Sequence, residues 1–438
     1  MGRGRGVPWD LVHPRSSVHV HGSCLWPVHH EGDEAVGDRG GWVHHPDAGE
    51  RRRDFALCGS CVTFAGLGVG ISYSSLGVRG REIIVAFRLP GAGPRAARAR
   101  VVVLYGGQSP EHAVSLASAR GVLEGLNARV HEPLAVVISG EGRWATPGDS
   151  SGVVLDLSTG EFLRYGAGRA VYSLGRPDVV FPVLHGPLGE DGTVQGLLEL
   201  AGLPYVGSGV LASAACMDKE WTKRLAAAAG IPIAPYAVVD GVRPTIGGLL
   251  DRLGTPVFVK PARGGSSIGV SRAATPGELD TALRVAAGYD SKVLVEAGMR
   301  GVEVMCGVLE LSGEPVGSPL AEVSLDDGGF FDYDAKYASP HPHFTVPARL
   351  DDTTTRRVRD MATTVFRVLG CRDLARVDFF VTPAGKVLLN EVNTMPGFTP
   401  HSLFPQMWKA AGLGYPDLLD HLIRAALRSP ATGLRPAA

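Results

Sequence analysis

Two strand-forming runs near the carboxyl end of the chain carry charged side chains where a sheet would normally bury apolar ones. The runs, residues 376–381 and 387–393, flank the Pro-Ala-Gly sequence at 383–385, which is typical of a hairpin turn. A hairpin that is symmetric about this turn places Asp378 directly opposite Glu391. Because two opposed carboxylates repel each other across a β-ladder, the pairing is costly unless a cation lies between them.

The same register places Arg376 opposite Asn393, so that all four polar side chains share one face of the hairpin. Carboxylate and amide oxygens suit Mg²⁺, which binds to few carboxylates together with substrate phosphates. We therefore expect Asp378, Glu391 and Asn393 to hold this metal. The alternative is a solvated edge hairpin whose polar face contacts only water.

The loop that follows the hairpin favours the metal site over that alternative. It contains Thr-Met-Pro-Gly at 394–397 and His-Ser-Leu at 401–403. Backbone N–H groups in a Gly/Pro loop at a strand end are free to bind an anion. The hairpin and this loop together indicate a site for a metal and a phosphate.

The composition indicates a globular protein of two or three domains. The 438 residues are 45% hydrophobic and 20% charged. A net charge of -1 argues against a nucleic-acid-binding surface. Cys216, Cys306 and Cys371 lie in apolar runs, as reduced cysteines of a cytosolic protein do, so we expect a cytoplasmic location.

Residues 1–97 show little periodicity and are rich in Gly, Arg and His. We expect a disordered extension, or upstream sequence included by a wrongly placed start. An uncharged stretch at 56–78 follows three arginines, as in a signal anchor, but its Gly, Ser and Thr content makes it only weakly hydrophobic. The histidines of this segment, with Cys58 and Cys61, fit no closed zinc site.

Beyond this extension the pattern predicts an α/β fold. Residues 100–105 form a continuous apolar run, typical of a buried parallel strand. A helix follows from Ser115, and its apolar face is marked by Leu116, Ala119, Val122, Leu123 and Leu126. A second buried strand, residues 178–184, leads into a helix over 193–201. A strand, a glycine turn and a helix in this order begin an α/β layer.

Polar loops follow both strands at their carboxyl ends, where open α/β sheets bind ligands. The first loop contains Glu111 and His112, a pair that by itself is more typical of a solvated loop. The second begins at His185 and reads His-Gly-Pro-Leu-Gly-Glu-Asp-Gly. The helix after it offers its N-terminus to an anion.

A third polar loop, residues 261–270, follows an apolar strand that ends at Lys260. Its glycines and its serines, Ser266 and Ser267 among them, can place N–H groups and hydroxyls around phosphates. It is not a Walker loop, because the Gly-Lys-Ser order is absent and the loop joins two strands. A flexible hairpin tip is the alternative.

Two further segments have the composition of ligand-binding elements. A short link with Gly298 and Gly301 joins two strands, and its backbone could hydrogen-bond a flat base. Residues 326–347 are polar, with aromatic residues and three prolines, and include Lys336 and Tyr337. This is the composition of an active-site lid.

These stretches together resemble the ATP-grasp superfamily and, within it, the D-alanine:D-alanine ligases, over nearly all of residues 100–428. The resemblance is specific because six separated motifs occur in the family's order. They are Gly-Gly-x-Ser-x-Glu-His at 106–112, His-Gly-x-x-Gly-Glu-Asp-Gly at 185–192, Met-Asp-Lys at 217–219, Lys-Pro-x-x-Gly-Gly-Ser-Ser-Ile-Gly at 260–269, Asp-Ala-Lys-Tyr at 334–337, and Arg-x-Asp with Asn-Glu-Val-Asn-Thr-Met-Pro-Gly at 376–397.

The resemblance implies an α/β, ATP-grasp fold of three α/β domains. We expect an N-terminal parallel-sheet domain for substrate over 98–204, a central domain over 205–300 and a C-terminal domain over 301–428. The last two contain antiparallel sheets, and residues 429–438 form a tail.

The resemblance also implies a reaction. The γ-phosphoryl group of ATP passes to the carboxylate of one D-alanine, and the amine of a second attacks the acyl phosphate. The product is D-alanyl-D-alanine for peptidoglycan precursors. The implied cofactors are ATP and two Mg²⁺ or Mn²⁺ ions, and the implied assembly is a homodimer without a nucleic-acid or membrane partner.

The family's substrate residues match positions of this chain. Glu111 would receive the ammonium group of the first D-alanine, linked through Ser266 and Tyr337. Arg376 and the Gly397 amide would neutralise the carboxylate and then the tetrahedral oxyanion. The remaining substrate residues implied are His185, Lys336, Ser402 and Leu403.

The resemblance likewise assigns nucleotide contacts. Lys219 and Lys260 would bind the phosphates, with Ser266 and Ser267 in the phosphate loop. Two further residues complete the implied nucleotide contacts: Glu303 would bind the ribose, and Glu296 lies at the start of the link that would bind the adenine. The family usually has a lysine after this glutamate, whereas this sequence has Ala297. Backbone contacts must therefore contribute more to binding of the nucleotide.

Two rival hypotheses remain open. A D-alanine:D-lactate ligase or another amino-acid ligase needs nearly the same residues, although Tyr337 favours D-alanine. An ATP-binding regulator without catalysis predicts that acid or arginine positions are broken, whereas Glu111, Arg376 and Asp378 are all present.

Overall fold

The computed structural model describes residues 98–149, 151–166, 171–240, 246–323 and 344–429, with two short paired strands, β1 (Val78–Arg79) and β2 (Glu82–Ile83). The chain divides into two units, residues 1–91 and 92–438, and the predicted site lies wholly in the second. The predicted lid, with Lys336 and Tyr337, lies outside the described residues except for its last four, and so does nearly all of the N-terminal extension.

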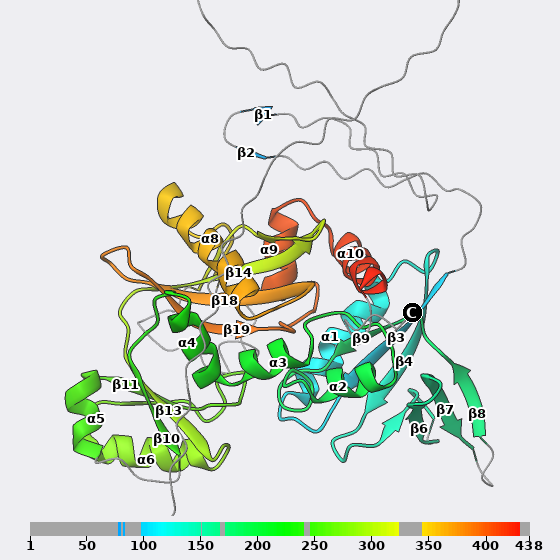
Figure 1. Cartoon of the computed structure of the whole chain (residues 1–438), viewed down its shortest axis with the longest axis horizontal. Coiled ribbons are helices and arrows are strands. Elements are labelled where there is room, and N and C mark those ends of the chain that lie inside the picture. The colour runs from blue at the N-terminus through cyan, green and yellow to red at the C-terminus, as the bar shows by residue number, and fades with distance from the viewer. Residues whose placement is uncertain are drawn as a thin grey trace, which may run out of the picture. The chain divides into compact units, whose positions relative to one another are not determined.

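A four-stranded sheet begins the second unit, in the order β5-β4-β3-β9 (Figure 1). β3 lies between β4 and β9 and is parallel to both, as the apolar run at 100–105 predicted. A separate three-stranded antiparallel sheet inserts between β5 and β9. The strands are β3 (Ala99–Gly106), β4 (His131–Ile138), β5 (Trp144–Ala145), β9 (Val179–Val183), and, in the insertion, β6 (Val153–Asp156), β7 (Glu161–Tyr165) and β8 (Val171–Gly175).

Helix α1 (His112–Gly125) packs on this sheet, and the predicted positions Ala119, Val122 and Leu126 are buried in the core. The prediction that Leu116 belongs to the buried face is wrong, since its side chain is 39% exposed, whereas Ser115 and Ser118 are buried. The Ser115 hydroxyl accepts from the Gly106 N–H (2.8 Å) and donates to the Val183 carbonyl. Small hydrogen-bonding residues therefore let the helix approach the strand ends that carry the ligand loops.

A second sheet is antiparallel, in the order β10-β13-β11-β12, and helices α5 and α6 pack on it. Helix α6 has no counterpart in the sequence prediction, although its capping box, Thr275 with Glu278, was readable. The elements are β10 (Tyr236–Asp240), α5 (Ile246–Leu253), β11 (Val257–Pro261), β12 (Ser271–Ala273), α6 (Pro276–Ala287) and β13 (Lys292–Ala297).

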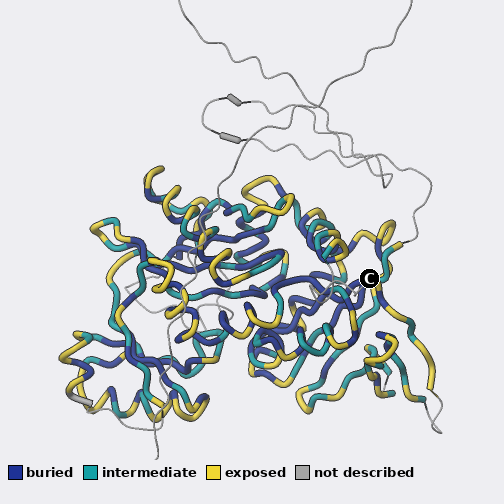
Figure 2. Tube along the Cα trace, viewed as in Figure 1, coloured by how far each residue is buried: buried dark blue, intermediate teal, exposed yellow. Residues whose placement is uncertain are grey.

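The largest sheet is also antiparallel and contains the predicted hairpin as β18 and β19. Its order is β17-β16-β14-β18-β19, with β15 paired to β14, and α8 packs on it. Figure 2 shows that β14 and β18, in the middle of this sheet, are buried along most of their length. The elements are β14 (Val302–Leu311), β15 (Glu314–Gly317), β16 (Ala321–Val323), β17 (Phe344–Thr345), α8 (Asp352–Val368), β18 (Leu374–Val381), β19 (Val387–Asn393), α9 (Leu403–Ala410) and α10 (Tyr415–Arg428).

Three helices connect the first sheet to the second. They are α2 (Thr193–Leu200), α3 (Val210–Met217) and α4 (Lys219–Ala228). Helices α3 and α4 contact β19, and Cys216 and Ala226 share a hydrophobic core with the largest sheet. No helix in the described ranges is long and apolar enough to cross a membrane.

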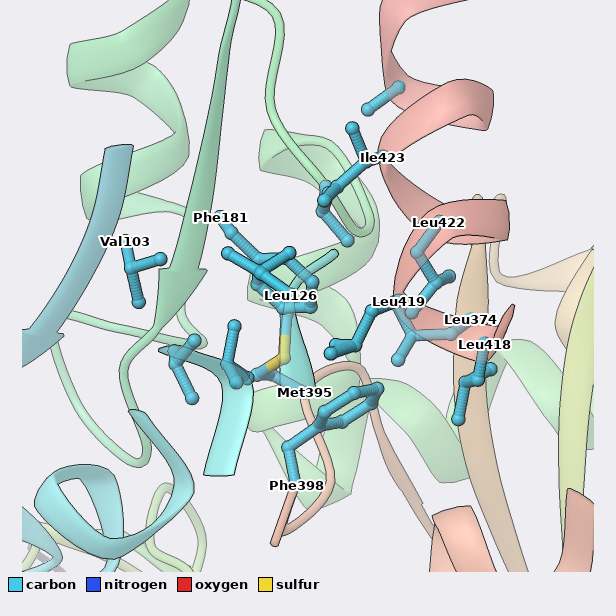
Figure 3. Packing of buried hydrophobic residues seen from close by; sticks show 14 of the residues in the cluster. Val103, Leu126, Phe181, Leu374, Met395, Phe398, Leu418, Leu419, Leu422 and Ile423 are labelled. Atoms are coloured by element: carbon cyan, nitrogen blue, oxygen red, sulfur yellow. The ribbon is translucent and has the colours of Figure 1, made fainter. Parts of the chain in front are cut away.

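A hydrophobic core joins the first sheet to the segment after the hairpin (Figure 3). Phe398 is fully buried, and its ring centroid lies 5.6 Å from that of Phe181 on β9 and 5.9 Å from that of Phe404 on α9. Met395 and the leucines of α10 belong to the same core. This packing fixes the loop after β19 against the carboxyl end of the parallel sheet.

Replacing Phe398 by Ala should destabilise the fold by about 3–5 kcal/mol, because it leaves a cavity where three elements meet. Denaturant unfolding followed by tryptophan fluorescence measures the change. Leu157→Ala is the control, since Leu157 is 43% exposed and its truncation should change stability by less than about 0.5 kcal/mol. Equal effects of the two substitutions would contradict this role of Phe398.

Candidate active site

The hairpin has the predicted register at its polar end, but it reaches this register through a bulge that the sequence analysis did not predict. Near the turn the pairs run from Val381 with Val387 to Phe379 with Leu389, one residue away from the symmetric register. A bulge that leaves Asn390 unpaired then restores the prediction.

Beyond the bulge, Asp378 lies opposite Glu391, and Arg376 lies opposite Asn393. Gly385 has φ 74°, so the turn itself depends on a residue that adopts left-handed backbone. The turn and the bulge together determine which polar residues face each other.

Basic side chains already surround the opposed carboxylates. Arg376 donates two hydrogen bonds to Asp378, at 2.8 and 2.7 Å, and lies 3.9 Å from Glu391. The Lys219 ammonium is 3.6 Å from the other Glu391 oxygen. Asp378 is only 1% exposed, so its charge requires this compensation.

The donor set on this face suits a divalent cation. Asp378 and Glu391 offer carboxylate oxygens, and Asn393 offers an amide whose buried nitrogen has no hydrogen-bond partner within the described ranges. Oxygen donors of this kind bind Mg²⁺ or Mn²⁺ rather than softer metals.

A cavity of about 780 Å³ adjoins the metal face, between the antiparallel sheets. Its walls include the last residues of β13, the first residues of β14 and the loop after β11. Seven of the residues predicted from the sequence line it: Lys219, Lys260, Ser266, Ser267, Glu296, Glu303 and Glu391.

A buried charge cluster forms one wall of this cavity. The Glu296 carboxylate lies 2.7 Å from the Lys260 ammonium and 2.9 Å from that of Lys223. Burial alone would raise the pKa of Glu296, but the charges of Lys223 and Lys260 outweigh it and lower this pKa to about 2. The carboxylate is therefore ionised at neutral pH. Sequence analysis gave Lys223 no role, because nothing in a helical lysine reveals burial.

The loop after β11 is held in a conformation suited to anions. Ser266 and Ser267 have φ of 51° and 58°, a region that non-glycine residues adopt rarely and mostly at functional sites. Lys219 is the first residue of α4, whose N-cap is Asp218. Its backbone N–H donates to Ala262 (3.0 Å) and its ammonium to Gly264 (2.6 Å), which ties the helix to the loop.

The same loop reaches the first sheet. The Ser266 hydroxyl donates to Glu111, which lies in the turn before α1. A Cβ on Gly265 would come within 2.6 Å of a Glu111 carboxylate oxygen, so a larger residue would require the Glu111 side chain to shift. The structure thus brings together Glu111 and Ser266, which are 155 residues apart.

His185 is buried and positions the loop after β19. Its Nδ1–H donates to the Met395 carbonyl (3.0 Å), and its Nε2 accepts from Ser118 (3.0 Å), whose hydroxyl also accepts from the Phe398 N–H (3.1 Å). Burial lowers the pKa of His185 to about 4, so the ring is neutral. With both ring nitrogens engaged by the protein, a direct substrate contact by His185 stays a prediction.

Glu190 is a site residue to which sequence analysis gave no role, although it belongs to the motif at 185–192. Its carboxyl group accepts from the N–H of Gly186 (2.7 Å) and of Met395 (3.2 Å). Burial and the nearby charge of Glu111 raise its pKa to about 8. The motif could have indicated it, because Gly189 and Gly192 flank two acidic residues, Glu190 and Asp191, which have little packing value.

The last predicted residues lie where the loop after β19 enters α9. Ser402 is the N-cap residue of α9, and its hydroxyl accepts from the Thr399 N–H (3.1 Å). Gly397 lies beside Ser402, and Leu403 is the first residue of the helix. A second cavity, about 820 Å³, borders the loops after β3 and β9, but His185 is the only predicted residue in its described lining.

Comparison with known proteins gives concordant matches. Residues 100–208 match the family model described as D-ala D-ala ligase N-terminus, and residues 225–424 match D-ala D-ala ligase C-terminus. A D-alanine--D-alanine ligase of Frankia casuarinae is 47% identical over 381 residues, covering 77% of this chain and 98% of that protein.

Two solved structures are also similar to this chain. The VanG D-Ala:D-Ser ligase of Enterococcus faecalis has a TM-score of 0.67 at 36% identity, covering 75% of this chain and 99% of that one. The D-alanine-D-alanine ligase of Coxiella burnetii has a TM-score of 0.65 at 35% identity, covering 75% and 95%.

The low pKa of His185 predicts a pH dependence of stability. A histidine whose folded pKa is depressed contributes stability above its unfolded pKa of about 6.5 and loses it as the pH falls towards about 4. The loss between pH 7 and pH 4.5 should be on the order of 2 kcal/mol. His185→Asn, which retains a donor for Met395, should lower the melting temperature at pH 7 and show a weaker acid dependence. Parallel pH profiles for wild type and variant would contradict this.

Proposed function

Because the chain belongs to the D-alanine–D-alanine ligase family, we propose that its hairpin face and the adjoining cavity carry out the family's reaction. That reaction is the ATP-dependent joining of two D-alanines, with release of ADP and phosphate. The chain is a carbon-nitrogen ligase with an ATP-grasp fold, and its product serves peptidoglycan synthesis.

One observation carries the residue assignment: the cavity lined by the predicted nucleotide residues opens beside the opposed carboxylates of Asp378 and Glu391. ATP placed there has its base at the link after β13, near Glu296, and its ribose at Glu303. Its phosphates then point to Lys219 and Lys260. Phosphoryl transfer depends mainly on such positioning and on charge neutralisation.

We propose that Asp378, Glu391 and Asn393 hold the divalent metal, as Mg²⁺ or Mn²⁺, with two ions in all. When bound, these ions would neutralise the charge that builds up on the transferring phosphoryl group. Arg376, already beside both carboxylates, would orient the substrate carboxylate and stabilise the later oxyanion together with the Gly397 amide.

Glu111 would bind the ammonium group of the first D-alanine, and its hydrogen bond with Ser266 would connect this group to the phosphate loop. His185 would act as a positioning residue, because its hydrogen bond to Met395 fixes the loop that carries Gly397. Tyr337 completes the proposed link to Glu111.

The second D-alanine needs a site for its carboxylate. We assign this site to Lys336, Ser402 and Leu403, where the N-terminus of α9 favours an anion. Closure of the segment with Lys336 would exclude water, which otherwise hydrolyses the acyl phosphate. We further propose a cytoplasmic homodimer.

The test of this function is phosphate release from ATP and Mg²⁺ with D-alanine, with D-alanine plus D-serine, and with D-alanine plus D-lactate. We expect release that requires D-alanine, with D-alanyl-D-alanine identified by mass. A folded protein that releases no phosphate with any of these substrates would contradict the proposal.

The three proposed domains place all activity after residue 97. The chain shortened to begin at Arg98 should therefore keep the kcat and KM of the full chain within about twofold, because no assigned residue is removed. The same phosphate assay measures this. A folded but inactive shortened chain would show that the extension contributes to the site.

Glu391→Gln should lower kcat by about 10²–10³ while changing KM for ATP far less, because charge neutralisation matters most in the transition state. Steady-state kinetics at saturating Mg²⁺ measure the two effects. Glu314→Gln is the matched control, since this exposed glutamate lies on the same sheet and away from the cavity. An unchanged kcat in Glu391→Gln would contradict the metal assignment.

A further inference from the structure

Lys223 is a buried ammonium to which the proposed reaction gives no role. It lies on α4 one turn after Lys219, and its side chain is 1% exposed. The cavity wall in front of it is made by Lys219, Lys260 and Glu296. A lysine is rarely buried this completely without a strong electrostatic reason.

The partner of Lys223 is Glu296, across from Lys260. One carboxylate is thus in direct contact with two ammonium groups, at 2.9 and 2.7 Å. The ring centroid of Tyr236 lies 5.9 Å from the Lys223 ammonium, a contact that also favours a cation. Burial lowers the pKa of Lys223, and the charge of Glu296 opposes this.

The charge balance of the cluster differs from that of its neighbours. On the hairpin face, Arg376 contacts both Asp378 and Glu391, and Lys219 contacts Glu391, so the described contacts give two cations for two carboxylates. Glu296 contacts two ammonium groups, so the cluster of Lys223, Glu296 and Lys260 carries one net positive charge. If Lys223 were uncharged, Lys260 and Glu296 would form a neutral pair, and the wall would attract an anion much less.

We propose that Lys223 is a positioning residue for nucleotide binding, which neutralises Glu296 and thereby leaves the charge of Lys260 available to the nucleotide phosphates. This inference rests on the proposed placement of ATP in the cavity. It assigns Lys223 to affinity, not to the chemical step, because the residue lies behind the lining and touches Glu296 instead of the cavity.

Lys223→Met, which keeps the length of the side chain and removes its charge, tests the proposal. We expect the KM for ATP and the dissociation constant of ADP by calorimetry to rise about tenfold. At saturating ATP, kcat should fall far less. Unchanged ADP affinity in a folded Lys223→Met protein would overturn the proposal.

A double-mutant cycle separates this role from simple packing. Once Glu296→Gln has removed the carboxylate that Lys223 neutralises, adding Lys223→Met should change ADP affinity less than twofold. An equal loss in both backgrounds would mean that Lys223 acts through packing, and would overturn the proposal. If Lys223→Met does not fold by itself, Glu296→Gln and the double variant, both without the unpaired carboxylate, still give this comparison.

The proposed function and the proposed role of Lys223 can be disproved independently of each other. A wild-type chain that binds ADP but releases no phosphate with D-alanine would contradict the proposed function, and the calorimetric cycle would still decide the role of Lys223.

Discussion

The repulsion between Asp378 and Glu391, opposed across one hairpin, is the constraint on which the rest of the site depends. The bulge at Asn390 brings the two carboxylates face to face, since the register near the turn would pair Asp378 with Asn390 instead. Arg376 and Lys219 compensate the resulting charge, and both come from positions fixed by secondary structure. The proposed metal face is therefore part of the fold itself, before any ligand binds.

Loops from the first, the second and the largest sheet meet at this face. The loop after β11 contacts Glu111 of the first sheet through Ser266, and the loop after β19 is fixed to the first sheet by His185 and Phe398. Lys219 connects α4 to the loop after β11 through its hydrogen bond to the Gly264 carbonyl. Each contact joins residues far apart in sequence, so the site can form only when the sheets are assembled.

The sequence predicted the α/β class, the parallel order of β3 and the paired carboxylates, because these follow from periodicity and strand alternation. It did not predict the bulge at Asn390, since strand patterns near a turn fit two registers one residue apart. The burial of Lys223 was also unpredictable from local pattern, because it results from tertiary packing around charges. The prediction for Leu116 was wrong because Ser115 and Ser118, which are polar in sequence, occupy buried positions of the helix through hydrogen bonds.

The most direct test of the central claim is Mn²⁺ binding in the presence of a non-hydrolysable ATP analogue, followed by electron paramagnetic resonance of the free ion. The account predicts two Mn²⁺ per wild-type chain and weaker binding of at least one ion in Glu391→Gln, because that substitution removes one of the two opposed carboxylates. Identical stoichiometry and affinity in the two proteins would contradict the claim that the hairpin face holds the metal.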